Sequence, residues 1–422
     1  MNSRERIKKV LAHNEPDKLP VDFGATHITG IQASIVYKLR QWYGLDDTPA
    51  PVKIIEPYEM LGEIKDDLKE IIGVDCVGLW GRKNIFGYVN DDWKEWKLFD
   101  GTPVLVPEKF NTEIDDDGNV YQYAEGDKKY KPCAKMPKKG YYFDSIIRQK
   151  KIEEDKLDPV DNLEEFGLIS DKDLNYLKIE AEKLFGNTEY ALVGSFVSSA
   201  FGDIALVPGP MLKDPKGIRD VEEWYISTCT RKDYVKRIFD KQCEIAIENY
   251  RKIFNEVGNK VDVVVTTGTD FGTQNGLFIS KELYREVFKP FHIRLNKWIH
   301  ENTDWKIFNH TCGSIFDLIP DFIEAGFDIL NPVQISAAKM DPKTLKKEFG
   351  KYLTFWGGGI DTQKTLPFKT PKEVKAEVRQ LIDIFNRDGG FVFNAIHNIQ
   401  SNIPIENIVA MIEVLNEFKK NI

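Results

Sequence analysis

The most informative stretch of this chain is an apolar run that ends in two metal-ligand residue types, Trp305-Lys-Ile-Phe-Asn-His310-Thr-Cys312-Gly313. A helical segment is expected directly after it, and a second apolar run follows at 328–333. Continuous apolar runs that alternate with amphipathic helices are typical of parallel strands buried on both faces. The stretch therefore predicts one strand–helix unit of an α/β fold.

Eight runs of this kind occur along the chain. They predict parallel strands at residues 21–25, 74–80, 190–196, 261–267, 305–309, 328–333, 353–358 and 391–396. The clearest helical stretches are 281–302, 313–325, 371–386 and 405–419. Eight strands with alternating helices favour a closed (β/α)8 TIM barrel over an open doubly wound sheet. We interpret residues 1–422 as one such barrel domain with an N-terminal helical extension.

Residues 91–144 interrupt the alternation of strands and helices. This segment is rich in aromatic residues and contains the turn dipeptides Asp100-Gly101, Asp117-Gly118 and Glu125-Gly126. Short apolar stretches between turns of this type predict an antiparallel β meander. We expect the meander to be inserted after the second barrel strand, as a lid, a dimer arm, a docking surface or a simple decoration.

The composition excludes several classes of protein. The chain has 58 basic and 67 acidic side chains, a net charge of −9 and no obvious basic stripe, which disfavours binding to nucleic acid or to an anionic membrane. No stretch approaches the about 20 apolar residues that span a bilayer, and the polar N-terminus does not resemble a secretory signal. Five widely spaced cysteines suggest reduced thiols in a cytoplasmic protein.

Polar residues gather where the predicted strands end, and in TIM barrels these carboxyl ends carry the active site. The residues at these positions are Asp22, His27, Ser195, Asp270, Gln274, His310, Cys312, Asn331, Gln334, Asp361 and His397. In an extended backbone, His310 and Cys312 point to the same side, and His397 ends the eighth strand. Thiolate and imidazole favour zinc, and three protein ligands leave one position open for a reactant. The alternative is a hydrogen-bonded histidine and a buried thiol without a metal.

Three further residues at the strand ends are candidates for a catalytic role. Asp270 could orient a ligating imidazole, bind a polar group of the substrate or cap the next helix. Asn331 and Gln334 could present amide groups to the substrate, or could hold the surrounding loop in place.

Several motifs resemble the uroporphyrinogen decarboxylase superfamily, whose members fold as (β/α)8 barrels. They are the N-terminal stretch from Arg4 to Phe23, His310-x-Cys312-Gly313, the stretch from Glu324 to Gln334, Gly357-Gly-Gly-Ile-Asp361 and Pro404-x-Glu406-Asn407-Ile408. The decarboxylases of this superfamily bind the acidic groups of their substrate with arginines in an early motif. The corresponding stretch here, from Val21 to Gly30, contains no arginine.

The motifs are most similar to the second branch of the superfamily, zinc-dependent methyltransferases that work with methylcobamide proteins. Their ligands are His-x-Cys and a late cysteine; His310 and Cys312 match, and His397 stands near the place of the late cysteine. The resemblance implies Zn²⁺, ligated by these three residues, and methyl transfer between a small substrate (a methyl ether or thiol) and a corrinoid. Because no cobamide domain follows the eighth unit, we expect the corrinoid on a separate protein. A homodimer is reasonable for this family. A metal-independent decarboxylase and a non-catalytic binding barrel are the alternatives.

Overall fold

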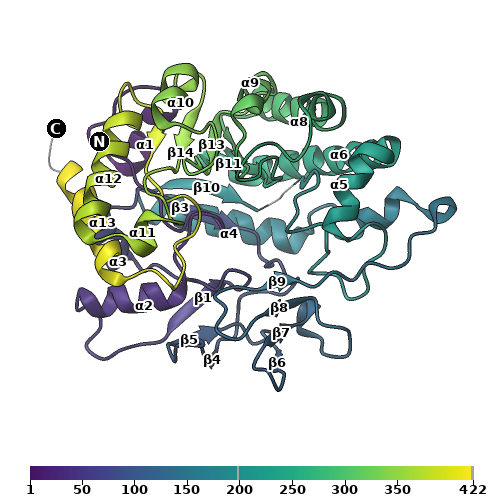
Figure 1. Ribbon diagram of the computed structural model, residues 1–422, viewed down its shortest axis with the longest axis horizontal. Coiled ribbons are helices and arrows are strands. Elements are labelled where there is room, and N and C mark those ends of the chain that lie inside the picture. Colours follow the sequence, from purple (N-terminus) through teal and green to yellow (C-terminus); the bar gives the residue numbers. More distant parts are fainter. Residues whose placement is uncertain (197–198, 420–422) are drawn as a thin grey trace.

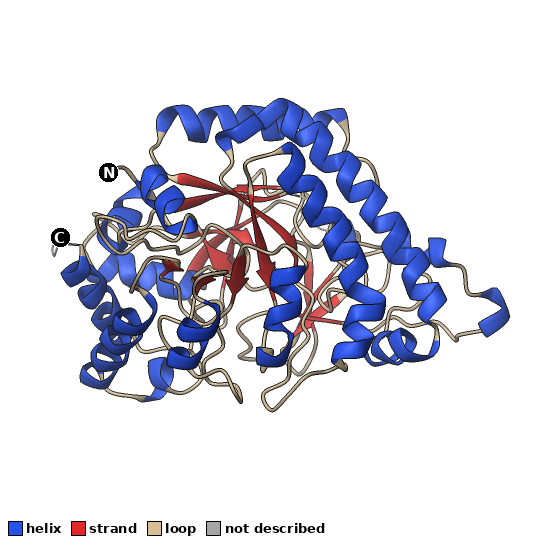
Figure 2. Cartoon of the chain, turned by 90° about the horizontal axis from the view of Figure 1, so that it is seen from above, coloured by secondary structure: helices blue, strands red, loops and turns tan. Residues whose placement is uncertain are grey.

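The centre of the molecule is a curved parallel sheet, seen in a computed structural model that describes residues 1–196 and 199–419. Seven strands in the described residues form it, in the order β15-β14-β13-β12-β11-β10-β3. Their bounds are β3 Cys76–Trp80, β10 Ala191–Ser195, β11 Val263–Thr267, β12 Lys306–His310, β13 Ile329–Asn331, β14 Thr354–Trp356 and β15 Phe391–Val392. Figure 2 shows these strands at the centre, with helices around them. Seven of the eight predicted barrel strands are therefore present, in chain order.

The eighth position of the barrel is filled by irregular backbone, so the strand predicted at 21–25 is wrong. The Asp22 amide donates to the Phe393 carbonyl at 2.9 Å, and the Asp75 amide donates to the Val21 carbonyl at 2.7 Å, which joins the two edges of the sheet. Beyond Val21 the chain turns at Gly24, where φ is +94°, and the Ala25 amide bonds to the Asp22 side chain instead of a neighbouring strand. Such local side-chain bonds compete with a strand ladder. The ring is nevertheless closed, as a TIM-barrel-like fold requires.

Helices follow the strands and cover the outside of the sheet (Figures 1 and 2). The longer ones are α2 Ala33–Trp42, α4 Asp171–Asn187, α5 Val221–Thr230, α6 Lys232–Val257, α8 Lys289–Asn302, α10 Pro342–Phe349, α12 Pro371–Phe385 and α13 Ile405–Phe418. The helix predicted at 281–302 consists of α7 Lys281–Leu283, a π-helical turn at Tyr284–Phe288 and α8. The predicted helix at 313–325 is shorter, a 3-10 turn at Phe316–Leu318 followed by α9 Ile319–Glu324.

The N-terminal helix α1, Ser3–Leu11, closes the amino end of the barrel. Its apolar residues Ile7, Val10 and Leu11 belong to the same buried cluster as side chains from the barrel strands, including Phe308 and Trp356. The helix is also fixed by an ion pair of 2.6 Å between Arg6 Nη1 and Asp75 Oδ1, just before β3. Because this end is filled, access to the barrel interior is left to the carboxyl ends of the strands.

The segment inserted after β3 forms the predicted antiparallel meander at the lower edge of Figure 1. Its strands β6 Thr112–Ile114, β7 Val120–Gln122, β8 Ala134–Met136 and β9 Asp144–Ser145 pair in order. The preceding hairpin, β4 Lys94–Lys97 and β5 Pro103–Val106, joins a second sheet that the sequence did not suggest. There β5 pairs in parallel with β1, Val52–Glu56, which in turn pairs with β2, Leu61–Gly62.

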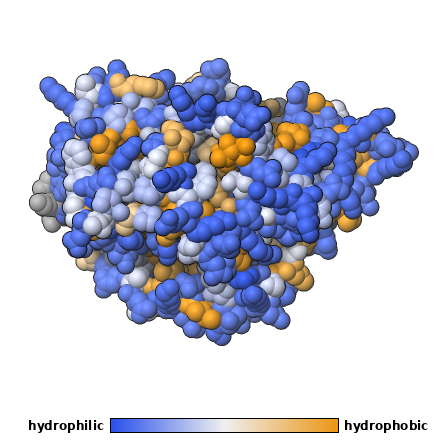
Figure 3. All heavy atoms as spheres, turned by 90° about the horizontal axis from the view of Figure 1, so that it is seen from below, coloured by the Kyte–Doolittle hydropathy of each residue, from blue (hydrophilic) through white to orange (hydrophobic). Residues whose placement is uncertain are grey.

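The face shown in Figure 3 is mainly hydrophilic, with its apolar side chains in small separate groups. No helix among the described residues is long and apolar enough to cross a bilayer.

A buried carboxyl group at the end of β1 should make folding sensitive to pH. Burial raises the pKa of Glu56 from 4.5 to about 8, although the amides of Tyr58 and Glu59 donate to it. The folded chain therefore binds more protons than the unfolded chain between pH 4.5 and about 8, and stability falls as pH rises through this window. Between about pH 6 and pH 9, the free energy of unfolding of the wild type should fall by about 2 kcal/mol more than that of Glu56→Gln, as measured by urea denaturation. An equal fall in both proteins would show that Glu56 does not cause the pH dependence.

Candidate metal centre

Two histidines and one cysteine meet at the carboxyl end of the barrel. One ligand atom from each of His310, Cys312 and His397 lies within 4.8 Å of the others. Cys312 Sγ is 3.5 Å from His310 Nε2, and the rings of His310 and His397 are 5.4 Å apart between their centres. His310 ends β12, whereas His397 follows β15, three strand positions away in the sheet. The closed barrel thus brings together the three residues that the sequence suggested as ligands.

Asn331 fixes the orientation and the tautomer of His310. Its side-chain nitrogen donates to the Trp356 carbonyl at 2.7 Å, so its oxygen must accept the 2.6 Å hydrogen bond from His310 Nδ1. His310 Nδ1 therefore carries the proton, and Nε2 keeps a lone pair directed toward Cys312. A hydrogen bond of this kind to the far nitrogen is the usual companion of a metal-bound histidine.

The other two candidate catalytic residues hold the loop that carries Cys312. Asp270 Oδ1 accepts from the Cys312 amide at 2.6 Å, and Gln334 Oε1 accepts from the Gly313 amide at 2.7 Å. Gly313 has a φ of +90°, and a Cβ there would lie 2.3 Å from the backbone of Gly272. The chain therefore turns sharply directly after Cys312. Holding the loop was one of the two roles expected for Gln334, whereas for Asp270 it is a role that the sequence did not suggest.

The loop that carries His397 is tied to the loop after the first barrel segment. His397 has a left-handed φ of +65°, and the neighbouring Asn398 accepts from the Gly30 amide at 2.6 Å and donates to the His27 carbonyl at 2.9 Å. His27 consequently lies at the mouth, with Nδ1 3.3 Å from Ser195 Oγ and its ring edge-on to Trp80. Its side chain is solvent-accessible, as expected for a loop histidine.

The environment of His310 and Cys312 favours neutral side chains in the absence of a metal ion. Burial, together with the nearby His397, lowers the pKa of His310 to about 3. Burial and the neighbouring Asp270 raise the pKa of the Cys312 thiol above its ordinary value. Neutral imidazole is the form that ligates a metal, and metal binding must release the proton of the thiol.

Two acidic residues that the sequence did not single out also lie at the mouth. Asp203 follows β10 in a turn where Ala200 and Phe201 have left-handed φ values, and burial raises its pKa to about 7. A Cβ at Gly268 would lie 2.6 Å from Asp203 Oδ2, so the Asp203 side chain would have to shift to admit a larger residue there. Glu59 comes from the turn between β1 and β2. Neither belongs to a motif, and only the tertiary structure brings them to the site.

Some of the polar residues at strand ends do not belong to the mouth. Asp22 lies inside the barrel, where Trp356 Nε1 donates to it at 2.9 Å and burial raises its pKa to about 6. Asp361 accepts from the amides of Gln363 and Lys364 and so stabilises its own turn. Gln274 accepts from Gln334 Nε2 at 3.2 Å and thereby supports the loop at Cys312.

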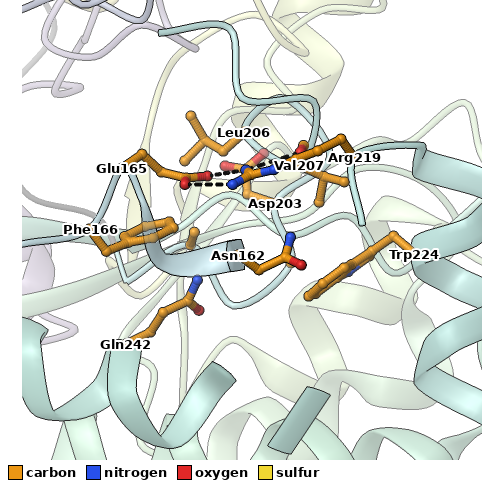
Figure 4. Close-up of a pocket in the computed structure, with 11 residues that line it drawn as sticks. Asn162, Glu165, Phe166, Asp203, Leu206, Val207, Arg219, Trp224 and Gln242 are labelled. Atoms are coloured by element: carbon orange, nitrogen blue, oxygen red, sulfur yellow. Dashed lines mark hydrogen bonds and ion pairs between the residues drawn. The ribbon is translucent and has the colours of Figure 1, made fainter. Parts of the chain in front are cut away.

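A small cavity behind the β10 loop is separate from the three candidate ligands (Figure 4). Its wall contains an ion pair between Arg219 and Glu165, 2.6 Å long, in which the side chains are only 1% and 4% exposed. The other lining residues include Asn162, Phe166, Asp203, Leu206, Val207, Trp224 and Gln242. Arg219 also donates to the carbonyls of Asp161 and Lys216, so this ion pair holds together the two segments that contain those residues.

Comparison with known proteins finds similarity to one family and to one solved fold. Residues 211–418 match the model of the family Uroporphyrinogen decarboxylase (URO-D). A solved methyltransferase from Methanosarcina mazei shares the fold of this chain with a TM-score of 0.54 and 16% sequence identity over 99% of each chain. No curated protein matches this chain in sequence. The match to URO-D includes all three candidate ligands and the residues that hold them.

Loss of the hydrogen-bond partner of His310 should weaken metal binding. We expect Asn331→Ala to lower zinc affinity about 10- to 100-fold, because the ring of His310 loses the acceptor that fixes its tautomer. Asn331→Asp keeps an acceptor for His310 but loses the donor to the Trp356 carbonyl, and its zinc affinity should lie between those of Asn331→Ala and the wild type. Competition against a chromophoric chelator measures both values. Equal losses in the two variants would show that the acceptor has no such role.

Proposed function

We propose that this protein is a zinc-dependent methyltransferase that moves a methyl group between a small substrate and a corrinoid carried by a separate protein. The observation that carries the proposal is the grouping of His310, Cys312 and His397, with donor atoms within 4.8 Å of one another and His310 Nε2 left free by the bond to Asn331. The match of residues 211–418 to the uroporphyrinogen decarboxylase family and the likeness in fold to a methyltransferase are in agreement with it.

The donor set fits a zinc ion. Two imidazoles and one thiolate are ligands that zinc prefers, and a three-residue set leaves a coordination position for the substrate. Zinc held there would supply Lewis acidity to the oxygen or sulfur atom of a bound methyl ether or thiol. Compared with two thiolates and one imidazole, this set carries one negative charge less, which favours polarisation of an ether.

The protein's own residues would orient the reactants. Asn331 holds the ring of His310, while Asp270 and Gln334 hold the turn at Cys312, so the donor atoms are positioned before a metal ion arrives. The filled amino end of the barrel leaves the mouth as the side from which a substrate and a corrinoid protein would approach. We keep a cytoplasmic location, a separate corrinoid partner and a homodimer as parts of this proposal.

Decarboxylation of an acidic substrate is the weaker candidate. Such a substrate needs cationic side chains to bind its carboxylates. Within residues 1–196 and 199–419, no lysine or arginine forms a hydrogen bond or ion pair with the side chains of the three candidate ligands, Asp270 or Glu59. The acidic side chains of Asp203 and Asp270 lie there instead.

A methyl-transfer assay tests the proposed function. The purified chain, with its zinc content measured, is mixed with methylcobalamin and thiols, or with cob(I)alamin and methoxylated aromatics or methylamines, and the cobalt spectrum is followed. We expect transfer that disappears after chelation and returns with zinc. Transfer that persists in protein shown to be free of metal would overturn the mechanism, and decarboxylation unaffected by chelator would favour the second candidate.

A further inference from the structure

A second group of side chains faces the barrel mouth, at the carboxyl ends of β3 and β10. Cys76 of β3 and Val193 of β10 belong to the cluster that fills the barrel interior. Because every second side chain of a strand points to the same side, Trp80 and Ser195 at the ends of these strands face inward as well. They are directly opposite each other in the pairing of β3 with β10. His310 ends β12 in the same way, so these strand ends share one mouth.

His27 joins this group and connects it to the loop of a candidate ligand. Its Nδ1 is 3.3 Å from Ser195 Oγ, and its ring lies edge-on to the indole of Trp80, with ring centres 6.5 Å apart. Its carbonyl accepts from Asn398 Nδ2 at 2.9 Å, and Asn398 directly follows His397 in the chain. We call the side chains of Trp80, His27 and Ser195 the mouth wall.

The mouth wall is accessible to solvent. His27 is exposed, and Trp80, Ser195 and the inward-facing Gly78 are half-buried, whereas the outward-facing Leu79 is buried. A Cβ at Gly78 would lie 1.9 Å from Trp80 Nε1, so the indole lies across the space that a side chain at this position would fill. The glycine therefore allows the indole to lie along the inner surface of the barrel.

Two hydrogen-bonding groups of the mouth wall are not used by the protein. Neither Trp80 Nε1 nor His27 Nε2 forms a hydrogen bond with any residue that the structure describes. When the hydroxyl of Ser195 donates to His27 Nδ1, the proton of the neutral imidazole is on Nε2. The wall then presents two neutral N–H donors beside an aromatic surface.

The chemistry of this wall favours an uncharged aromatic ligand that carries a hydrogen-bond acceptor. Aromatic side chains with a few fixed polar groups are typical of sites for small organic molecules, and aromatic ring pairs contribute more than the burial of their area alone. Among the described residues, no lysine, arginine, aspartate or glutamate side chain contacts the three side chains of the wall by a hydrogen bond, ion pair or cation–π interaction. A charged ligand group would find no opposite charge on this wall.

We propose that Trp80, His27 and Ser195 bind the substrate of the metal centre, and that this substrate is an uncharged aromatic ring with an oxygen acceptor, as in a methoxyphenol. The ring would lie on the indole of Trp80, and its oxygen would accept from His27 Nε2 while Ser195 fixes the imidazole. This inference rests on the proposed function, because it names the substrate class of the same site, an aryl methyl ether.

Binding of guaiacol (2-methoxyphenol) to the full chain, treated with chelator, tests the inference. Ligand-observed NMR titrations give Kd for guaiacol and for its saturated analogue, 2-methoxycyclohexanol. We expect the wild type to bind guaiacol at least about fivefold more tightly, and Trp80→Leu to remove this preference. His27→Ala should raise Kd for guaiacol about three- to tenfold, as the loss of one hydrogen bond does. Trp42→Leu and His300→Ala, at exposed residues away from the mouth, are the matched controls and should bind like the wild type.

Three outcomes would overturn the proposal. They are no detectable binding of guaiacol by the wild type, equal affinity of the wild type for guaiacol and its saturated analogue, and an unchanged Kd in both Trp80→Leu and His27→Ala. The first two need no variant and are independent of whether a variant folds. His27→Gln keeps a donor at this place and should retain more affinity than His27→Ala.

The titration uses neither zinc nor a corrinoid, so its result is separate from that of the methyl-transfer assay. Zinc-dependent methyl transfer to a thiol by a protein that does not bind guaiacol would contradict this inference and leave the proposed function intact. Binding of guaiacol at the mouth wall without any methyl transfer would support the site and contradict the proposed function.

Discussion

Replacing Cys312 by alanine is expected to lower the affinity of the protein for zinc by well over about 100-fold. Loss of a residue that only hydrogen-bonds to a ligand typically costs about 10- to 100-fold, and loss of a ligand itself should cost more. Cys312 supplies the one thiolate of the trio, and its sulfur is 3.5 Å from His310 Nε2. Without it, two imidazoles remain, and these cannot hold zinc at a three-ligand site.

The measurement is a competition titration with a chromophoric chelator, together with metal analysis of the purified protein. Cys229→Ala is the matched control, because this cysteine is exposed and outside the barrel mouth, and it should bind zinc like the wild type. His310→Ala should resemble Cys312→Ala. Unchanged zinc content and affinity in both variants would show that the metal, if bound, is held elsewhere.

Breaking the buried ion pair at the cavity in Figure 4 should have the largest effect on stability. Glu165→Ala leaves the Arg219 guanidinium, 1% exposed, without its bidentate partner. An uncompensated buried charge costs about 3–5 kcal/mol. Glu164, 3.6 Å from Arg219, can replace part of the lost interaction, so we expect about 3 kcal/mol.

Urea denaturation of the two proteins gives this difference. The control is Glu153→Ala, which removes a carboxylate from an exposed pair with Lys156 and should cost no more than about 0.5 kcal/mol. Replacing both buried partners, as Arg219→Met with Glu165→Leu, should cost less than Glu165→Ala alone. A cost for Glu165→Ala no larger than that of the control would show that the pair does not stabilise the fold.

The strands of the barrel could be predicted because their burial is written in local sequence. Runs such as Val263–Thr267, three valines followed by two threonines, show no alternation, and all five residues are buried, as in a strand covered on both faces. The first segment is the exception: Val21 and Phe23 are apolar, but side-chain bonds from Asp22 and Thr29 turn the chain after one residue pair. The apolar pattern therefore marked its burial correctly and its conformation wrongly.

The candidate ligands were also accessible from sequence, for a geometric reason. His310 and Cys312 are two residues apart at a strand end, and a TIM barrel directs all strand ends to one mouth, so His397 could be assigned to the same place. The sequence left two roles open for Asn331 and Gln334, substrate binding or holding the loop. In the structure their amide groups hold His310 and the turn at Gly313, contacts that depend on the packing of neighbouring strand ends.

By itself, then, the sequence determined which segments are buried strands and which chemical groups stand at their ends, because these follow from residue type and spacing. Only the tertiary structure decided that Glu59 and Asp203 reach the mouth. Their positions depend on contacts between distant segments. Glu59 accepts from Gln400, and the neighbouring Tyr58 accepts from Ser145 of β9, whereas Asp203 follows a left-handed turn and lies against Gly268. No local pattern records such contacts, since they arise only when the closed ring and its insertion have folded together.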